Sequence, residues 1–213
     1  DLDRAVERCA VGGYAYAGQS CISVQRILVH QEVYGEFLRR FVARVAKLRT
    51  GDPLDPETEV GPMIDEAAAH RAESWIAAAV DDGARVEVGG GRTRAVLEPA
   101  VLTRTKPEQQ VNCEEVFAPV TTVTPYPNFA EAVEVLNATP YGLQAGIFTR
   151  DVRRLMHAWD HLDVGGVMGN DIPSFRVDRM PYGGAKASSL GREGVRYAIQ
   201  EMTEPRLLTI QTE

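Results

Sequence analysis

Apolar residues return at helical intervals between residues 34 and 48. They follow i, i+3, i+4 and i+7 spacing, so one stripe of the predicted helix is hydrophobic while its basic residues lie elsewhere. The stripe consists of Tyr34, Phe37, Leu38, Phe41, Val42, Val45 and Leu48. A second helix is predicted over residues 65–82, because Asp65 is a suitable N-cap and Gly83 a suitable C-terminal stop.

Runs rich in β-branched residues alternate with the predicted helices. Strands are predicted at residues 24–30, 84–88, 95–102, 120–123, 143–149, 165–168 and 207–210. The remaining helices are predicted at residues 3–16, 128–136, 151–161 and 195–201. Asn128 and Glu131 have the spacing of a capping box, and the strand at 165–168 is expected to be buried. The alternation predicts an α/β fold with a mostly parallel sheet covered by helices.

The composition excludes several kinds of partner. The chain has 213 residues, long enough to bury about 70% of the surface of its unfolded form. Its 23 basic and 30 acidic residues give a net charge of −7, which argues against a nucleic-acid or anionic membrane surface. No apolar run approaches the ~20 residues of a membrane span. We therefore expect no nucleic-acid partner and no membrane association.

The three cysteines, Cys9, Cys21 and Cys113, are widely spaced and form no C-x-x-C pair. An odd number of separated cysteines predicts free thiols in a reducing, cytoplasmic compartment. The histidines include an i, i+4 pair, His157 and His161, but no H-E-x-x-H motif. Because zinc sites need three or four converging ligands, no metal site is predicted.

Three motifs each allow a functional and a structural interpretation. In Gly18–Ser23, free backbone N–H groups at a break between helix and strand could activate the thiol, although cysteine is also a common small core residue. In Cys113–Val120, adjacent acids precede an apolar strand, as they also do in a solvated turn. The glycine-rich segment Met180–Gly194 could cradle a ligand or wrap the core. The residue pattern alone leaves these alternatives open.

Taken together and in this order, the three motifs resemble those of the aldehyde dehydrogenase superfamily. Gly18–Cys21 is similar to its nucleophile motif. Glu114–Val120 is similar to E-E-[IV]-F-G-P-V, with Ala118 in place of the usual glycine. Pro181–Glu193 is similar to P-F-G-G-x-K-x-S-G-x-G-R-E, with Ser189 in place of a glycine. The resemblance covers nearly every residue and includes Asn137–Leu143 and Asn170.

This resemblance implies a reaction and a set of site residues. An aldehyde would be oxidised to a carboxylate through a thiohemiacetal and a thioester on Cys21, whose backbone N–H would lie in the oxyanion hole. The cofactor would be NAD or NADP, with Glu115 hydrogen-bonded to the nicotinamide ribose and Phe117 packed beside the nicotinamide. The residues implied to line the substrate channel or to lie near the site are Ser20, Ile22, Asn170, Ser174 and Phe175.

The segment Val164–Arg179 resembles a particular branch of that superfamily. This bacterial and archaeal branch contains lactaldehyde dehydrogenases and non-phosphorylating glyceraldehyde-3-phosphate dehydrogenases. In such an enzyme, Arg176 and Arg179 would favour an anionic or hydroxylated aldehyde.

The resemblance also implies a domain organisation. Residues 1–204 would form the catalytic domain, and residues 205–213 a C-terminal oligomerisation strand and tail that pairs with a neighbouring subunit in a homodimer or homotetramer. The cofactor-binding domain of the family, which carries the general base, has no match in the chain, so we expect a fragment with little dehydrogenase activity on its own. Two alternatives remain: an aldehyde dehydrogenase that transfers the acyl group to coenzyme A, and a non-catalytic oligomerisation module.

Overall fold

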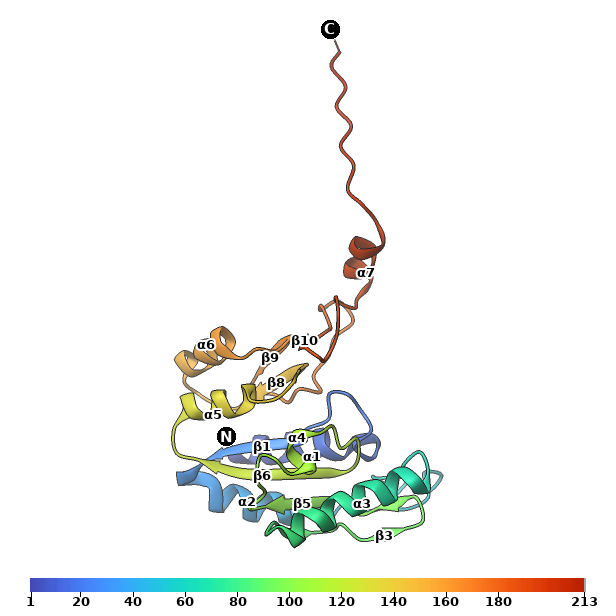
Figure 1. Ribbon diagram of the computed structural model, residues 1–213, viewed down its shortest axis with the longest axis vertical. Coiled ribbons are helices and arrows are strands. Elements are labelled where there is room, and N and C mark those ends of the chain that lie inside the picture. The colour runs from blue at the N-terminus through green and yellow to red at the C-terminus, as the bar shows by residue number, and fades with distance from the viewer. Residues whose placement is uncertain (213) are drawn as a thin grey trace.

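The computed structural model describes residues 1–212 and centres on a four-stranded sheet in the order β1-β6-β5-β2 (Figure 1). Strands β1 (Arg26–His30) and β5 (Ala100–Thr103) both run parallel to β6 (Val120–Tyr126). The edge strand β2 (Arg85–Val88) is antiparallel to β5. The predicted mostly parallel α/β sheet is therefore confirmed.

Two helices pack against each other and against this sheet. They are α1 (Leu2–Tyr14) and α2 (Gln31–Val45). The predicted stripe on α2 faces the core, where Phe41 is fully buried between the rings of Tyr14 and Phe37. The buried Tyr14 hydroxyl lies 3.0 Å from the carbonyl oxygen of Ala100 and 2.7 Å from Thr121 Oγ1. These hydrogen bonds attach the end of α1 to the strands beneath it.

The predicted helix starts depend on polar N-caps. Asp65 precedes α3 (Glu66–Asp81) and accepts a hydrogen bond from the backbone N–H of Ala68 at 2.7 Å. Asn128 accepts one from Ala130 N–H at 2.8 Å, at the start of α5 (Phe129–Asn137). Each side chain satisfies a donor that the helix leaves free. Both predicted caps are confirmed.

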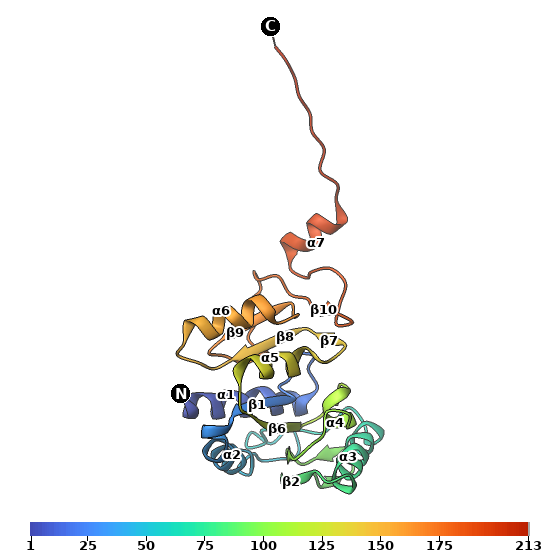
Figure 2. The same cartoon turned by 60° about the vertical axis from the view of Figure 1, so that its left-hand side comes forward.

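A second, smaller hydrophobic cluster lies apart from the main core. Its buried members are Val133, Ile147, Ala158 and Leu162. They come from α5, α6 (Val152–His161) and the parallel pair β8 (Gln144–Ile147) and β9 (Gly166–Gly169). Figure 2 shows these elements stacked on one side of the main sheet. The expectation of a buried strand at 165–168 is wrong, because β9 belongs to a two-stranded sheet and its residues are half-buried or exposed.

One predicted strand is interrupted. The run at 95–102 divides into β4 (Val96–Leu97) and β5, because Pro99 lacks the N–H that a continuous ladder needs. β4 instead forms a hairpin with β3 (Arg92–Thr93). The sequence pattern missed β3 and three other short elements, which are α4 (Gln110–Cys113), β7 (Tyr141–Gly142) and β10 (Ala185–Lys186).

The C-terminal segment leaves the body of the protein. Helix α7 (Val195–Met202) has no buried residue, and the chain beyond it extends away from the other elements (Figures 1 and 2). The predicted strand Leu207–Ile210 is wrong for the single chain, because it has no neighbouring strand within residues 1–212. A strand exists only through hydrogen bonds to a second strand. Leu207, Leu208 and Ile210 remain exposed.

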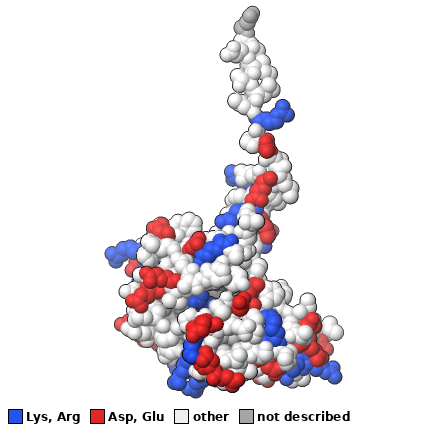
Figure 3. Space-filling model, viewed as in Figure 1, with Lys and Arg blue, Asp and Glu red and all other residues white. Residues whose placement is uncertain are grey.

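Surface charge is mixed in sign. On the face drawn in Figure 3, acidic and basic side chains are interspersed over the body and α7. Within residues 1–212, no helix combines the length and the apolar character that crossing a bilayer requires.

A close backbone contact connects α1 with the segment before β6. The short helix η1 (Ala15–Gly18) follows α1, and three of its residues, Tyr16, Ala17 and Gly18, adopt φ of 53°, 54° and 67°. A Cβ added to Gly18 would lie 2.1 Å from the carbonyl oxygen of Ala118. Only glycine therefore lets the two backbones approach this closely.

We predict that Gly18→Ala destabilises the fold by about 2 kcal/mol or more, because the new methyl group adds strain at positive φ and must displace the Ala118 peptide. Chemical denaturation of the variant and of the unchanged chain measures the difference in their free energies of unfolding. The matched control is Gly35→Ala in α2, where a Cβ would meet nothing within 4 Å, and this change should stabilise the protein by about 0.5–1 kcal/mol. If Gly18→Ala is as stable as the unchanged chain, the contact with Ala118 does not require glycine at position 18.

Candidate active site

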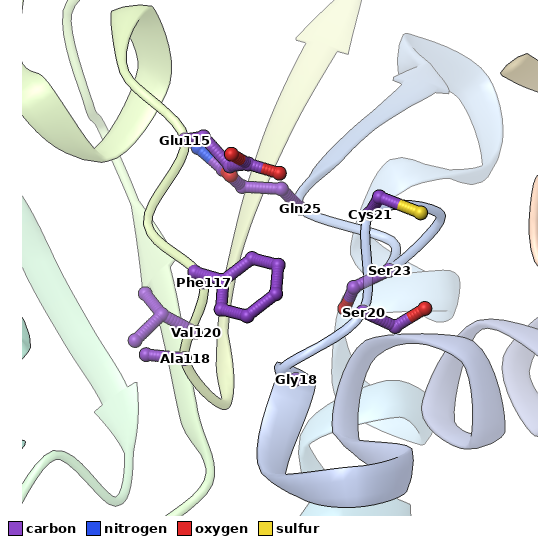
Figure 4. A pocket seen from close by; sticks show the side chains of 9 residues that line it. All are labelled: Gly18, Ser20, Cys21, Ser23, Gln25, Glu115, Phe117, Ala118 and Val120. Carbon is purple, nitrogen blue, oxygen red and sulfur yellow. The ribbon is translucent and has the colours of Figure 1, made fainter. Parts of the chain in front are cut away.

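Cys21 stands at the tip of the turn between η1 and β1 and is exposed. It borders a cavity to which Glu115 and Phe117 also contribute (Figure 4). The cavity is lined by Gly18, Ser20, Cys21, Ser23, Gln25, Glu115, Phe117, Ala118 and Val120. The fold therefore brings together four of the predicted site residues from two distant segments.

The turn that carries Cys21 is tied to the end of α1. Val24 N–H donates to the carbonyl oxygen of Gly12 at 3.0 Å, and Ser23 Oγ donates to the same oxygen at 3.2 Å. Ser23 N–H closes the turn on the Ser20 carbonyl oxygen at 3.0 Å. Within residues 1–212, the backbone N–H of Cys21 has no acceptor. It is therefore free to donate to an oxyanion formed at the sulfur.

Gln25 holds the opposite wall of the cavity in place. Its side-chain amide nitrogen donates to the carbonyl oxygen of Glu114 at 2.7 Å, and its amide oxygen accepts from Val116 N–H at 3.1 Å. These bonds lie on either side of Glu115 and fix the backbone there. The sequence does not predict this role of Gln25, because a glutamine just before a strand belongs to no pattern that indicates a long-range contact.

Glu115 and Phe117 present unused surface to the cavity. Both residues are exposed; Phe117 is 41% exposed and has a φ of 50°. The Glu115 carboxylate forms no ion pair within residues 1–212. Figure 4 shows both side chains on one side of the cavity and Cys21 on the other, with its sulfur directed away from Phe117. An unpaired carboxylate beside an open aromatic face suits a ligand that has hydroxyl groups and a planar ring.

A second cavity adjoins the other side of Cys21. It is lined by Cys21, Leu143, Tyr182, Gly183, Ser188, Ser189, Leu190, Gly191 and Glu193. Most of these residues belong to the glycine-rich segment, which therefore lies beside the thiol instead of only wrapping the core.

Tyr182 contacts the nucleophile candidate directly. Its hydroxyl oxygen lies 2.7 Å from Cys21 Sγ. Burial, followed by the hydrogen bond to Cys21, raises the pKa of the Tyr182 hydroxyl above its ordinary value. The guanidinium of Arg176 lies over the Tyr182 ring, 4.3 Å from its centroid. The glycine-rich pattern predicts a role for this segment but not for Tyr182, although a tyrosine in the place of the phenylalanine of the P-F-G-G motif was an available signal.

The remaining predicted pocket residues divide into two groups. Ser174 donates through Oγ to the carbonyl oxygen of Ile22 at 2.7 Å, so both lie next to the Cys21 turn, and the neighbouring Phe175 is 43% exposed. Asn170 is bound elsewhere: its Oδ1 accepts from Thr149 N–H at 3.0 Å, and its carbonyl oxygen accepts from Arg4 at 3.1 Å. None of these residues, Ile22, Asn170, Ser174 and Phe175, lines either cavity at Cys21.

The other two cysteines have different environments from Cys21. Cys9 is buried inside α1, and this burial raises the pKa of its thiol to about 12. Cys113 is half-buried and donates to the carbonyl oxygen of Glu108 at 3.3 Å. All three thiols are free of disulfides, and the described part of the chain holds no cluster of His, Cys, Asp and Glu side chains suited to a metal ion.

Comparison with known proteins gives this site a family context. The profile of the aldehyde dehydrogenase family matches residues 1–208. The chain is 42% identical over 210 residues to the 3-sulfolactaldehyde dehydrogenase of Priestia megaterium, covering 99% of this chain and 44% of that protein. It is 39% identical over 212 residues to the lactaldehyde dehydrogenase of Methanococcus aeolicus, covering 100% of this chain and 45% of that protein. The chain thus spans less than half the length of these relatives.

Solved structures share the fold closely. Aldehyde dehydrogenase 21 from Physcomitrella patens, in complex with the reaction product succinate, has a TM-score of 0.94 and 46% identity over 96% of this chain and 42% of its own. The glyceraldehyde-3-phosphate dehydrogenase GapN from Methanocaldococcus jannaschii, complexed with NADP, has a TM-score of 0.92 and 40% identity over 95% and 44%. Betaine aldehyde dehydrogenase from Staphylococcus aureus, in complex with NAD+, has a TM-score of 0.90 and 33% identity over 94% and 41%.

The family profile, the relatives and the solved structures agree with one another. They also confirm the resemblance that the three motifs carry, including its link to lactaldehyde dehydrogenases and GapN-like enzymes. The chain belongs to the aldehyde dehydrogenase family.

Proposed function

We propose that this chain supplies the catalytic cysteine of an NAD(P)-dependent dehydrogenase that oxidises an aldehyde to a carboxylate. The observation that carries the proposal is the position of Cys21. Its exposed thiol stands between a cavity with a free carboxylate and an open aromatic ring, and a cavity walled by the glycine-rich segment.

The chemistry proposed for Cys21 begins with its thiolate. The sulfur attacks the aldehyde carbon, a C–S bond forms, and the carbonyl electron pair moves to oxygen, giving a thiohemiacetal oxyanion. The free backbone N–H of Cys21 donates a hydrogen bond to that oxygen. Loss of hydride from the carbon leaves a thioester on the sulfur. Water then cleaves the thioester, which releases the carboxylate and restores the thiolate.

The first cavity fits the nicotinamide end of a dinucleotide. The Glu115 carboxylate would accept hydrogen bonds from ribose hydroxyls, and the Phe117 ring would pack against the nicotinamide. When bound, the cofactor supplies the hydride acceptor for the oxidation. The structurally similar GapN and betaine aldehyde dehydrogenase were solved with NADP and NAD+, which supports either dinucleotide here.

Relatives and geometry together favour an anionic or hydroxylated aldehyde. The names of two similar proteins specify 3-sulfolactaldehyde, which is anionic, and lactaldehyde, which is hydroxylated but uncharged, and a third protein was solved with the dianion succinate. In this chain, Arg176 lies over the ring of Tyr182, whose hydroxyl touches the sulfur. The Arg176 side chain is 43% exposed, and its guanidinium lies 3.6 Å from the Glu193 carboxylate. We propose that Arg176 binds the anionic group of the substrate.

The C-terminal arm is proposed to act between subunits. Residues 205–213 would add a strand to a neighbouring copy in a homodimer or homotetramer, because exposed apolar residues on an extended chain favour pairing with another strand. The free thiols are consistent with a reducing, cytoplasmic location.

Reactivity of the three thiols tests the nucleophile assignment. We expect iodoacetamide to alkylate Cys21 fastest and Cys9 slowest in the native chain, because Cys21 is exposed whereas Cys9 is buried and its thiol has a pKa of about 12. Peptide mass spectrometry after timed quenching gives the three rates. The nucleophile assignment fails if Cys21 reacts no faster than Cys113.

A hybrid enzyme tests the activity. Residues 1–213 would replace the matching segment of the Priestia megaterium enzyme, and aldehyde-dependent formation of NADH or NADPH would be measured. We expect turnover, and Cys21→Ser should lower it about a thousandfold or more because the nucleophile is lost, whereas the control Cys113→Ser should retain it. Full turnover in Cys21→Ser would refute the mechanism. An acyl-CoA product on addition of coenzyme A would favour the acylating alternative.

Substrate charge tests the role of Arg176. In the same hybrid, Arg176→Gln should raise KM for a carboxylated or sulfonated aldehyde about tenfold or more, because an ion pair to the substrate is lost. KM for a neutral aldehyde of similar length should change little. Arg153→Gln, an exposed arginine on α6 that lines neither cavity at Cys21, is the matched control. If Arg176→Gln raises KM equally for charged and neutral aldehydes, Arg176 does not recognise the anionic group.

A further inference from the structure

We propose that the Tyr182 hydroxyl donates a hydrogen bond to the Cys21 thiolate and so stabilises and orients the nucleophile. The inference rests on the proposed function in that it treats Cys21 as the reacting group. It assigns a chemical role to a hydroxyl that the phenylalanine of the P-F-G-G motif would lack.

The donor is held in place by the fold. Tyr182 is only 6% exposed, and its backbone pairs with Glu193 in both directions, at 3.2 Å and 2.6 Å. Arg176 lies on its ring face, with 4.3 Å between the guanidinium carbon and the ring centroid. These contacts fix the ring, so the hydroxyl oxygen stays 2.7 Å from Cys21 Sγ without further ordering. A preorganised donor of this kind stabilises charge at little entropic cost.

The direction of the hydrogen bond follows from the order in which the two groups ionise. A thiol ordinarily loses its proton near pH 8.5 and a tyrosine near pH 10. Burial raises the pKa of the Tyr182 hydroxyl further, so the tyrosine keeps its proton when a thiolate forms beside it. The tyrosine proton then remains on its oxygen and is shared with the anionic sulfur. Hydrogen bonds to an ionised partner are roughly twice as strong as those between neutral groups.

The charged groups around the sulfur make an uncharged donor useful. Glu115 lines the first cavity and Glu193 the second, so a carboxylate borders each cavity beside Cys21. The cationic guanidinium of Arg176 lies 3.6 Å from Glu193 and is partly neutralised by it. The Tyr182 hydroxyl therefore supplies stabilisation that the nearby charges do not.

The contact also sets the direction of the sulfur. In Figure 4 the Cys21 side chain points away from the Phe117 ring, and the Tyr182 hydroxyl lies within hydrogen-bonding distance of it. The thiolate is thus held toward the second cavity, beside Glu193 and the glycine-rich segment. An aldehyde bound there would meet a nucleophile already oriented for attack.

The pH dependence of Cys21 alkylation in the 213-residue chain tests this role without aldehyde or cofactor. Tyr182→Phe removes only the hydroxyl and leaves Glu115, Glu193 and Arg176 in place. We expect the midpoint of the iodoacetamide rate profile to rise by about one unit and the rate at pH 7 to fall about tenfold, because the thiolate loses a charge-assisted hydrogen bond. Tyr34→Phe in α2 is the matched control and should leave the profile unchanged.

An unchanged midpoint in Tyr182→Phe would overturn the proposal, and so would a fall, which would mean that the hydroxyl accepts from the neutral thiol. Continued protection of the buried Cys9 in the same experiment shows whether the variant is folded. If Tyr182→Phe unfolds, 3-fluorotyrosine at position 182 replaces it, since its more acidic hydroxyl should lower the midpoint; no shift or a rise would overturn the proposal. These outcomes are independent of turnover in the hybrid enzyme, so each proposal can fail alone.

Discussion

The active-site geometry depends on one backbone contact, that of Gly18 with the Ala118 carbonyl group. Three successive residues in the left-handed region turn the chain out of α1, and only a residue without Cβ fits at the third of them. This contact sets Cys21 and Phe117 on facing sides of one cavity. Gln25 then fixes the distance between the walls through hydrogen bonds to the backbone on both sides of Glu115.

Cys21 borders two cavities whose lining side chains offer different chemistry. The side with Glu115 and Phe117 offers a hydroxyl acceptor and an aromatic face, as a nicotinamide riboside would need. The side with Tyr182 and Glu193 offers a hydrogen-bond donor close to the sulfur and a guanidinium behind it. This placement of two cavities around Cys21 suits a reaction in which the substrate carbon bonded to sulfur gives up hydride toward the first cavity. The rest of the substrate then extends into the second cavity. The glycine-rich segment is therefore part of the proposed site.

Local patterns predicted the elements well, because the stripe on α2 and the caps Asp65 and Asn128 depend on neighbours in sequence. The local pattern could not show that Leu207–Ile210 lacks a neighbouring strand within residues 1–212, since strand pairing depends on residues distant in sequence. The motif resemblance implied that Cys21, Glu115 and Phe117 lie at one site, and the three residues do line one cavity. Residue spacing alone had left this question open. The resemblance did not indicate that the Asn170 side chain accepts a hydrogen bond from Thr149 N–H, nor that Tyr182 contacts the sulfur, because both contacts depend on long-range packing.

The central claim is that Cys21 forms a covalent bond to the substrate carbon. Its most direct measurement is an acid quench of the hybrid enzyme during the first turnover with an aldehyde and NAD or NADP, followed by peptide mass spectrometry. A thioester shows as an acyl mass increment on the modified peptide. The account predicts this increment on the peptide containing Cys21 and on neither of the peptides containing Cys9 or Cys113. Product formation with the increment on another cysteine would contradict it.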